Sequence, residues 1–355
     1  MNNVKKLIDS GGHFNGLSIF SYNAIFNFIN TNRNLGKTWI FKYRAVKRAL
    51  KHGKKCIWVR TFENEVKECI STFFSSKDLR KFCGLVEYNK KTSPNGNFYR
   101  QGNTFYIKRK NKFVWFLKVV RVGSDNAMRS ADDVDVDTIV YDEYTTTPQK
   151  IRYYNGNLVD NFIDMFISAK REHKVNCYFL GNKENVSNLF FNYFNLKNID
   201  LSKEFIKLYK NNSILVCNIN NTPKEKNEYD KKIKCLFENT NYGNYLYKSK
   251  YKNENKIKCQ KTPPQATNYL QLYINNTPIK ISHYAGIFYI NNNIDTNLQI
   301  YVLQRQNKFK KEILLINRYK KYLQGFINAL SNNDVYYNNL NTYTIIQEFY
   351  KWLNI

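Results

Sequence analysis

Short apolar runs alternate with segments of spaced apolar residues over the first 200 positions of the chain. A short continuous apolar run is typical of a buried strand, whereas apolar residues at steps of three and four indicate one face of a helix. We expect strands at 24–30, 54–60, 103–108, 113–120, 138–142 and 175–180, and helices at 37–51, 63–74 and 156–168. Strands that alternate with helices predict an α/β domain with a mostly parallel sheet over residues 1–200.

The pattern changes after residue 200. Residues 201–255 hold few long apolar runs and many lysines, so we expect a basic linker region there, with one charged helix at 222–238. Beyond the linker, strands are expected at 269–274, 284–290 and 298–303, and helices at 311–330 and 342–353. This order predicts a small α+β domain over residues 256–355.

Charge narrows the class of partner. The 355 residues include 56 Lys and Arg against 28 Asp and Glu, which gives a formal net charge of +28. The basic residues outnumber the acidic ones two to one, and we interpret this excess as selected. A large positive field favours a polyanion. Nucleic acid is a better candidate than an anionic membrane, because no basic amphipathic helix stands out.

Other features exclude several classes of protein. No apolar run approaches the roughly 18 residues that a membrane span needs. The first residues lack the apolar stretch of a signal peptide, so we expect a cytosolic protein without membrane contact. The seven cysteines never occur at CxxC spacing, and the four histidines lie far apart. Neither structural zinc nor a disulfide framework is therefore expected.

The stretch Thr31–Thr38 ends in Gly-Lys-Thr between a predicted strand and a predicted helix, as a phosphate-binding loop does. Backbone N–H groups at a helix N-terminus bind phosphate. Lys37 would reach the β- and γ-phosphates of ATP, and the Thr38 hydroxyl would bind Mg²⁺. The expected ATP-binding residues are Asn32, Arg33, Asn34, Leu35, Gly36, Lys37 and Thr38. Thr31 stands where such loops carry their first glycine, and a chance Gly-Lys-Thr in a lysine-rich chain is the alternative.

Two carboxylates and an amide follow later strands. Asp142 and Glu143 end the apolar strand at 138–142, and Asn182 follows the strand at 175–180. Asp142 is expected to hold Mg²⁺, and Glu143 to polarise the attacking water as a general base. Asn182 is expected to sense the γ-phosphate. The alternatives are acids that end a strand in solvent and a chance Asn in an Asn-rich chain.

Four basic residues are candidates for a role beside the γ-phosphate. Arg33 lies in the loop, Arg60 ends the second strand, and Lys170 and Arg171 end a helix before the strand at 175–180. Solvent exposure explains Arg33 and Arg60 as well, and a helix C-terminus favours basic residues through its dipole alone. Lys170 and Arg171 are the candidates for a catalytic finger that reaches the site of a neighbouring subunit.

Together these motifs resemble the DNA packaging ATPases, or encapsidation proteins, of small phi-twenty-nine-like phages. The resemblance covers nearly the whole chain. It rests on residues 21–39 (SYNAIFNFINTNRNLGKTW), 56–65 (CIWVRTFENE), 137–144 (DTIVYDEY), 177–182 (CYFLGN) and 188–196 (NLFFNYFNL). The family carries Gly where Thr31 stands and Ser where Thr38 stands.

The resemblance implies a P-loop ATPase of the additional-strand, catalytic-glutamate type that drives double-stranded DNA into a procapsid, with ATP and Mg²⁺ as cofactors. It also implies a homo-oligomeric ring, with a pentamer as the expected size, seated on the capsid portal. The expected location is the host cytoplasm, at the portal vertex of the procapsid. Some relatives use a structural packaging RNA, and the sequence leaves this partner open.

The family's C-terminal domain resembles a ribonuclease-H-like nuclease that lost its active site. A two-metal nuclease needs about three clustered carboxylates. From residue 271 onward the only acids are Asp295, Glu312, Asp334 and Glu348, and Asn275 stands where a strand-end acid would be expected. We therefore expect this domain to bind nucleic acid without cutting it.

Candidates for DNA contact are the turn at 109–112, Lys118, Arg121 and the loop at 124–130. A motor that works on any genome sequence should grip phosphates rather than bases, although ordinary solvated basic turns explain the same residues. Two other functions stay open. Clustered carboxylates in the second domain would favour a large-terminase-like motor with an active nuclease. Absence of DNA-stimulated ATP hydrolysis would favour a non-enzymatic nucleic-acid-binding protein on a degenerate nucleotide fold.

Overall fold

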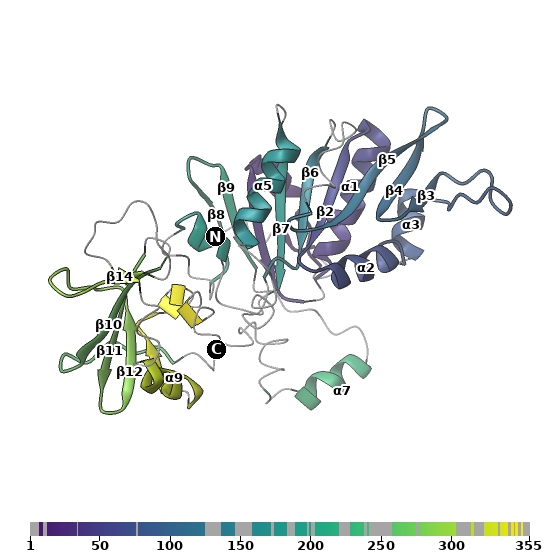
Figure 1. Ribbon diagram of the computed structural model, residues 1–355. Helices are drawn as coiled ribbons and strands as arrows, with labels where there is room; N and C mark the ends of the chain where they lie inside the picture. The colour runs from purple at the N-terminus through teal and green to yellow at the C-terminus, as the bar shows by residue number, and fades with distance from the viewer. Residues whose placement is uncertain are drawn as a thin grey trace. The chain divides into compact units, whose positions relative to one another are not determined.

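The chain forms two compact units in the computed structural model (Figure 1). Unit 1 comprises Met1–Glu184 and Asn198–Lys252, and unit 2 comprises Asn185–Lys197 and Asn253–Ile355. The structure describes residues 7–9, 13–33, 35–75, 77–124, 136–145, 158–171, 174–182, 189–196, 199, 203–219, 228–237, 240, 258–274, 277–302, 314–315, 323–332, 334–339, 342–343, 345–346 and 349–350. Among them, no helix combines the length and apolar character needed to cross a membrane.

Unit 1 is built on one nine-stranded sheet. Its strands lie in the order β3 (Phe98–Gln101), β4 (Thr104–Arg109), β5 (Lys112–Arg121), β2 (Lys55–Arg60), β6 (Val136–Asp142), β7 (Asn176–Asn182), β1 (Phe26–Thr31), β9 (Ile214–Asn218) and β8 (Phe205–Tyr209). The six strands from β5 to β9 are parallel. Antiparallel pairs β3–β4, β4–β5 and β8–β9 extend the sheet at both sides.

Helices cover both faces of the parallel strands (Figure 1). On one face, α1 (Lys37–His52) packs Phe41 against Tyr178 of β7, and α2 (Glu63–Thr72) and α3 (Lys77–Cys83) lie beside it. On the other face, Phe162 of α5 (Leu158–Lys170) packs against Tyr141 of β6. Because both faces are covered, the central strands are almost continuously buried, and most of them carry the short apolar runs that made them visible in the sequence.

Most expected elements of residues 1–200 are confirmed. The predicted strands correspond to β1, β2, β4, β5, β6 and β7, and the predicted helices to α1, α2 and α5. Sequence patterns missed β3 and α3, together with the short helices η2 (Gly16–Tyr22) and α6 (Leu189–Tyr193). These elements are too short to show a clear periodicity.

The expected linker at 201–255 is wrong in its first part. Residues 205–218 form β8 and β9, and β9 pairs directly with β1 inside the sheet of unit 1. All five residues of β9 are buried, but so short a run between Asn-rich turns does not stand out in the sequence. A domain boundary at residue 200 therefore cuts through unit 1. The charged helix is confirmed as α7 (Glu228–Phe237).

Unit 2 contains a six-stranded sheet. Its order is β14 (Leu314–Leu315), β13 (Tyr301–Val302), β10 (Thr267–Ile274), β11 (Thr277–Tyr284), β12 (Ile287–Asn291) and β15 (Val335–Tyr337). Strands β10, β11 and β12 are antiparallel, and the outer strands pair in parallel. The α+β class expected from the sequence is confirmed.

Individual elements of unit 2 differ from the expectation. Strand β11 was missed, because Pro278 and the polar residues of TPIKISHY disguise it. The helix expected at 311–330 is limited among the described residues to α9 (Gln324–Ser331), since residues 314–315 form β14. The described residues within 342–353 are helical, as expected.

Candidate active site

Three parallel strands of unit 1 end at the same edge of the sheet and carry the residues singled out from the sequence. Thr31 at the end of β1 pairs with Asn182 at the end of β7, and Asp142 at the end of β6 pairs with Leu180 of β7. The carboxyl ends of parallel strands are where open α/β sheets bind ligands. The loop after β1, the acid pair after β6 and Asn182 are therefore brought together as expected.

The loop between β1 and α1 does not need a glycine at Thr31. Thr31 is fully buried as the last residue of β1, and its hydroxyl donates to the Asn32 carbonyl at 2.8 Å. The position that requires glycine is Gly36, which has a φ of 81° and immediately precedes α1. As the N-cap residue of α1, Gly36 has no side chain that could accept from the first N–H groups of the helix. A helix N-terminus of this kind is suited to an acceptor from outside the helix. Asn34 lies outside the described residues.

Lys37 is the buried cation of the site. Its ammonium group donates to the Asn182 side-chain oxygen, so the loop and the end of β7 are in direct contact. Burial lowers the pKa of Lys37 to about 8, although Asp142 and Glu143 act in the opposite direction. At neutral pH this lysine is therefore still charged, but its charge is held at a cost that an added anion would relieve.

Asp142 joins the same cluster from β6. The Thr38 hydroxyl donates to Asp142 Oδ1 at 3.3 Å, so one hydroxyl and one carboxylate lie side by side. Asp142 is 6% exposed, and burial raises its pKa against the opposing effects of Arg60 and Lys37. A hydroxyl beside a carboxylate is the kind of oxygen pair that divalent cations bind.

Arg60 is the site residue that the sequence left undecided. From the end of β2, its guanidinium reaches Asp142 Oδ2 at 3.2 Å and Glu143 Oε2 at 3.2 Å. Burial alone would lower the pKa of Arg60, but Asp142 and Glu143 outweigh it and raise that pKa above its ordinary value. Its side chain is 10% exposed, so it is no ordinary surface charge. The adjacency of β2 and β6, which the sequence does not show, places it here.

The turn that carries Glu143 is held by polar contacts to β1 and β7. Glu143 has a φ of 57°, and its side chain is 49% exposed. Directly after it, the Tyr144 hydroxyl donates to Asn30 Oδ1 at 2.8 Å, and the Thr145 hydroxyl donates to the Asn182 carbonyl at 3.1 Å. A Cβ atom on Gly181 would lie 2.7 Å from Asn30 Oδ1, so only glycine permits this close approach.

Lys170 and Arg171 lie away from this cluster. They are exposed at the C-terminal end of α5, and α5 leads into the start of β7, whereas Asn182 ends that strand. The seven residues of β7 span about 20 Å at ~3.3 Å per residue. Within one chain these two cations are therefore not brought to Glu143. Arg33 is exposed on the loop, and its charge acts on Lys37.

The candidate DNA contacts also separate. The turn at 109–112 lies at the start of β5, Lys118 is half-buried in its middle, and Arg121 ends it opposite Arg60. The ten residues of β5 place the turn and Arg121 about 30 Å apart. Of the expected loop at 124–130, only Ser124 lies within the described residues.

Unit 2 presents no comparable cluster. Among the described residues of the chain, no three His, Cys, Asp or Glu side chains are placed to share a metal ion. In the middle of β10, Gln271 is fully buried and exchanges two hydrogen bonds with the backbone of Asp295. Asn275 lies outside the described residues.

Comparisons with known proteins agree over nearly the whole chain. The model of the family described as Podovirus DNA encapsidation protein (Gp16) matches residues 8–355. The DNA packaging protein of Bacillus phage B103 is 23% identical over 346 residues, which is 95% of this chain and 100% of the relative.

Two solved structures share the fold. A chain of the bacteriophage Phi-29 viral genome packaging motor assembly superposes with a TM-score of 0.65 at 20% identity, over 96% of this chain and 99% of the other. A chain of the Phi-28 gp11 DNA packaging motor superposes with a TM-score of 0.66 at 15% identity. The match covers 98% of this chain and 99% of the other. At these identities the likeness establishes the fold alone.

The buried pair of Arg60 and Asp142 should dominate the stability of the site. Arg60→Met should lower the free energy of unfolding by about 3–5 kcal/mol, because it leaves Asp142 buried without its main cation. In double-mutant cycles read by urea unfolding, Asp142→Asn should recover a large part of this loss. Glu143→Gln, the matched control at a half-exposed side chain, should couple to Arg60 by less than about 1 kcal/mol. Equal coupling for the two acids would contradict this assignment.

Proposed function

We propose that this chain, which belongs to the Podovirus DNA encapsidation protein family, is an ATP-hydrolysing motor. Its function is the packaging of phage DNA. The motor would translocate double-stranded DNA into a procapsid. The observation that carries this proposal is the contact of Lys37 with Asn182 and of Thr38 with Asp142. These contacts gather a buried cation, a hydroxyl, a carboxylate and a helix N-terminus at one edge of a parallel sheet. That set is suited to a nucleoside triphosphate and a divalent cation.

ATP would bind on the loop between β1 and α1. The proposed contacts are the backbone of residues 32–36, the ammonium group of Lys37 and the hydroxyl of Thr38. Two features support this fit: a Cβ atom added at Gly36 would meet no atom within 4 Å, and the N-cap residue of α1 is a glycine, which cannot cap the helix with a side chain. The chain's own charges also favour an anion here, because burial lowers the pKa of Lys37.

Mg²⁺ would be held by Thr38 and Asp142. When bound, the metal supplies positive charge that stabilises the transferring phosphoryl group. Asp142 can serve both neighbours, because Oδ1 faces Thr38 while Oδ2 accepts from Arg60. The residues present therefore suit the metal without loss of the buried ion pair.

Glu143 would orient and activate the attacking water as the general base. Its half-exposed carboxylate lies at the mouth of the cluster, and Arg60 fixes one of its oxygens. Asn182, hydrogen-bonded to Lys37, would report the state of the γ-phosphate to β7. Strand β7 lies between β1 and β6, which supports assignment to the additional-strand, catalytic-glutamate type of P-loop ATPase.

The finer domain assignment follows the same logic. We assign the P-loop ATPase domain to unit 1 and a ribonuclease-H-like, nucleic-acid-binding domain to unit 2. The antiparallel β10–β11–β12 meander flanked by parallel strands supports the second assignment. Gln271 in the middle of β10 and the absence of clustered acids among the described residues support a domain that does not cleave.

The assembly is proposed to be a homo-oligomeric ring, with a pentamer as the expected size, at the capsid portal in the host cytoplasm. A ring keeps hold of DNA without a separate clamp. A packaging RNA remains a candidate partner. The distance of Lys170 and Arg171 from Glu143 in one chain favours their action on the site of a neighbouring subunit.

Substitutions at Lys37 and Glu143 should separate binding from hydrolysis. Lys37→Ala should abolish measurable ATP binding, because it removes the phosphate cation. Glu143→Gln should retain ATP binding but lose hydrolysis by about 10²-fold or more, because it removes only the base. ATP binding by calorimetry and phosphate release with and without duplex DNA distinguish the two. Wild-type hydrolysis by Glu143→Gln would overturn the role of the acid pair, and no hydrolysis by the wild type would overturn the ATPase itself.

Nucleotide affinity should fall as the pH rises through about 8. The free protein loses the Lys37 proton near that pH, whereas the phosphate-bound form retains it. Binding then requires proton uptake, so affinity should fall by up to tenfold per pH unit above 8. Calorimetry from pH 7 to 9.5 measures this. Lys37→Arg, which stays protonated throughout, should bind more weakly and without this slope. A constant wild-type affinity would show that Lys37 does not contact the phosphates.

Mixing two inactive proteins should restore part of the ATPase activity. One carries Lys170→Ala and Arg171→Ala, and the other carries Glu143→Gln. If the basic pair acts on a neighbouring subunit, some interfaces in mixed rings combine an intact Glu143 with an intact finger. Phosphate release at several mixing ratios measures the recovery, which should peak at intermediate ratios. Full activity of the double-alanine protein alone would exclude both residues from the mechanism, and no recovery would place them in cis.

A further inference from the structure

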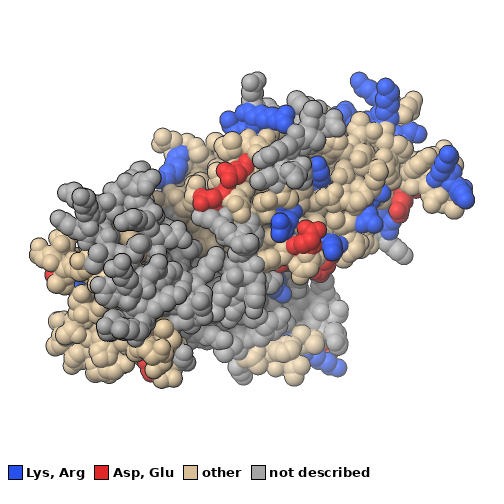
Figure 2. Space-filling view, viewed as in Figure 1, with Lys and Arg blue, Asp and Glu red and all other residues tan. Residues whose placement is uncertain are grey.

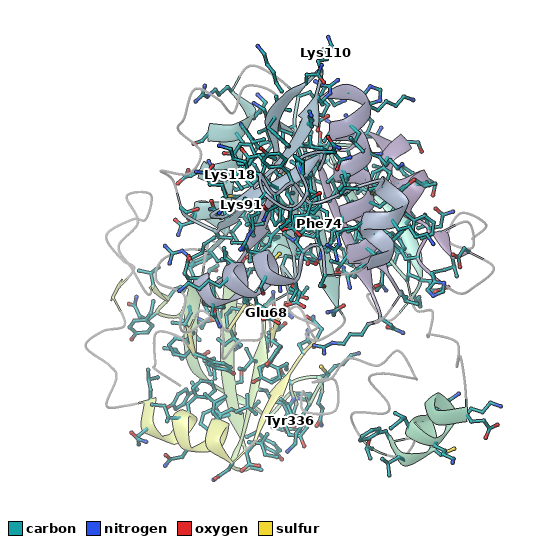
Figure 3. All side chains as sticks on the ribbon, turned by 90° about the vertical axis from the view of Figure 1, so that its right-hand side faces the viewer. Glu68, Phe74, Lys91, Lys110, Lys118 and Tyr336 are labelled. Atoms are coloured by element: carbon teal, nitrogen blue, oxygen red, sulfur yellow. The ribbon has the colours of Figure 1, made fainter. Side chains whose placement is uncertain are left out.

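A second concentration of charge lies at the opposite edge of the nine-stranded sheet. There the last turn of α1, the start of β2 and the turn between β4 and β5 meet. The Arg109 guanidinium lies directly against Gly53, the residue that ends α1, so the turn and the helix end are in contact. Figure 2 shows blue side chains gathered over this corner of unit 1, and Figure 3 places Lys110 at its extremity.

This corner, here called the basic corner, carries no acid on its own segments. Neither residues 37–60 nor residues 98–124 contain a single Asp or Glu. The basic corner consists of Lys47, Lys51, His52, Lys54, Lys55, Arg109, Lys110 and Lys112, all exposed or half-buried. Among the described residues, the neighbouring acid is Asp137 at the start of β6, and it is already paired with Arg48.

The basic corner is built on regular secondary structure and a tight turn rather than on an irregular loop. Lys110 and Asn111 have φ values of 45° and 62°, and Arg109 pairs with Lys112 across them. Positive φ at both central residues is the tight two-residue turn of β-hairpins. Nearby, the Lys55 ammonium lies 4.5 Å from the centre of the Trp115 ring. The backbone positions that carry these charges are thus fixed before any partner binds.

The stability of unit 1 does not account for so many like charges. A helix C-terminus favours basic residues in its last turn by about 0.3–1 kcal/mol each, which covers Lys51 and His52. This stabilisation does not extend to Lys110 and Lys112, because they lie on the β4–β5 hairpin, where their charges repel the basic residues at the helix end. A surface that is unfavourable for the isolated chain points to a polyanionic partner.

Nearby aromatic rings indicate that bases are not the part recognised. One face of Trp115 lies under Lys55, and Tyr99 and Tyr106 stack on each other with centroids 4.8 Å apart. Single-stranded nucleic acid is usually bound by ring faces that stack on bases. Contacts within the protein already use one face of each of these rings. The larger feature of the corner is its charge, which suits the phosphates of a duplex.

We propose that the basic corner binds the phosphate backbone of duplex DNA, at a site separate from the nucleotide cluster. The proposal rests on the proposed function only in taking duplex DNA as the partner. It uses none of the residues assigned to ATP or Mg²⁺. DNA binding at the basic corner is therefore expected without nucleotide and without sequence preference.

The test compares two charge-matched triple variants of the full chain. The corner variant carries Lys51→Gln, Lys110→Asn and Lys112→Gln; Asn is used at 110 because it tolerates positive φ. The control variant carries Lys207→Gln, Lys231→Gln and Lys232→Gln, three exposed lysines of β8 and α7. Fluorescence anisotropy of a labelled duplex, without ATP, gives the affinity at several salt concentrations.

The corner variant should lose at least about tenfold in affinity for duplex DNA at low salt, and the slope of log K against log salt should shrink by about 2 to 3. Its melting temperature should change by no more than a few degrees, because the lost helix-dipole contribution of Lys51 opposes the relief of like-charge repulsion. If it falls by more than a few degrees, the double variant Lys51→Gln, Lys112→Gln repeats the test with the turn intact. Wild-type binding by the corner variant, an equal loss in the control, or a loss seen only with duplex RNA would each overturn the proposal.

Discussion

Buried charge at the carboxyl edge of the nine-stranded sheet constrains the rest of unit 1. Lys37, Arg60 and Asp142 are each less than 10% exposed, and an isolated buried charge costs several kcal/mol. Arg60 pairs with Asp142, and Lys37 donates to Asn182. These contacts require β2 to lie beside β6, and β7 to lie between β6 and β1, whose following loop leads to Lys37. The order of the sheet and the pairing of the charges are therefore one requirement rather than two.

The same constraint explains why the cluster is not optimised for stability. Burial lowers the pKa of Lys37 and raises the pKa of Asp142, so each charge is disfavoured where it stands. Apolar side chains of similar volume would fill this edge at lower cost. Apolar side chains, however, could not supply the ligands that the proposed ATP and Mg²⁺ sites require. The cluster is thus held near the limit at which an incoming anion becomes a favourable partner for Lys37.

The sequence was most informative where function and chain order coincide. Gly36, Lys37 and Thr38 are consecutive, and Asp142 and Asn182 each follow an apolar strand, so backbone direction alone predicted that they meet. Arg60 could not be assigned in this way, because its role depends on which strand lies beside β6, and pairing partners are not encoded locally. Strand β9 was missed for a related reason. Its four consecutive apolar residues are recognised as a buried strand only once β1 is known to need a neighbour. At Thr31 the sequence pattern was misleading. Phosphate-binding loops carry a glycine at this position, but here the backbone belongs to the regular strand β1, which any residue can form.

Helix α1 links the two charged edges of unit 1. Lys37 is its first residue and Lys51 lies in its last turn, about 21 Å away at 1.5 Å per residue. Its far end is fixed by the Gly53 N–H, which donates to the Ala49 carbonyl at 2.9 Å, and by Arg109 against Gly53. The cluster around Lys37 and the basic corner therefore lie at the two ends of one continuous helix, although no side chain of one contacts the other among the described residues.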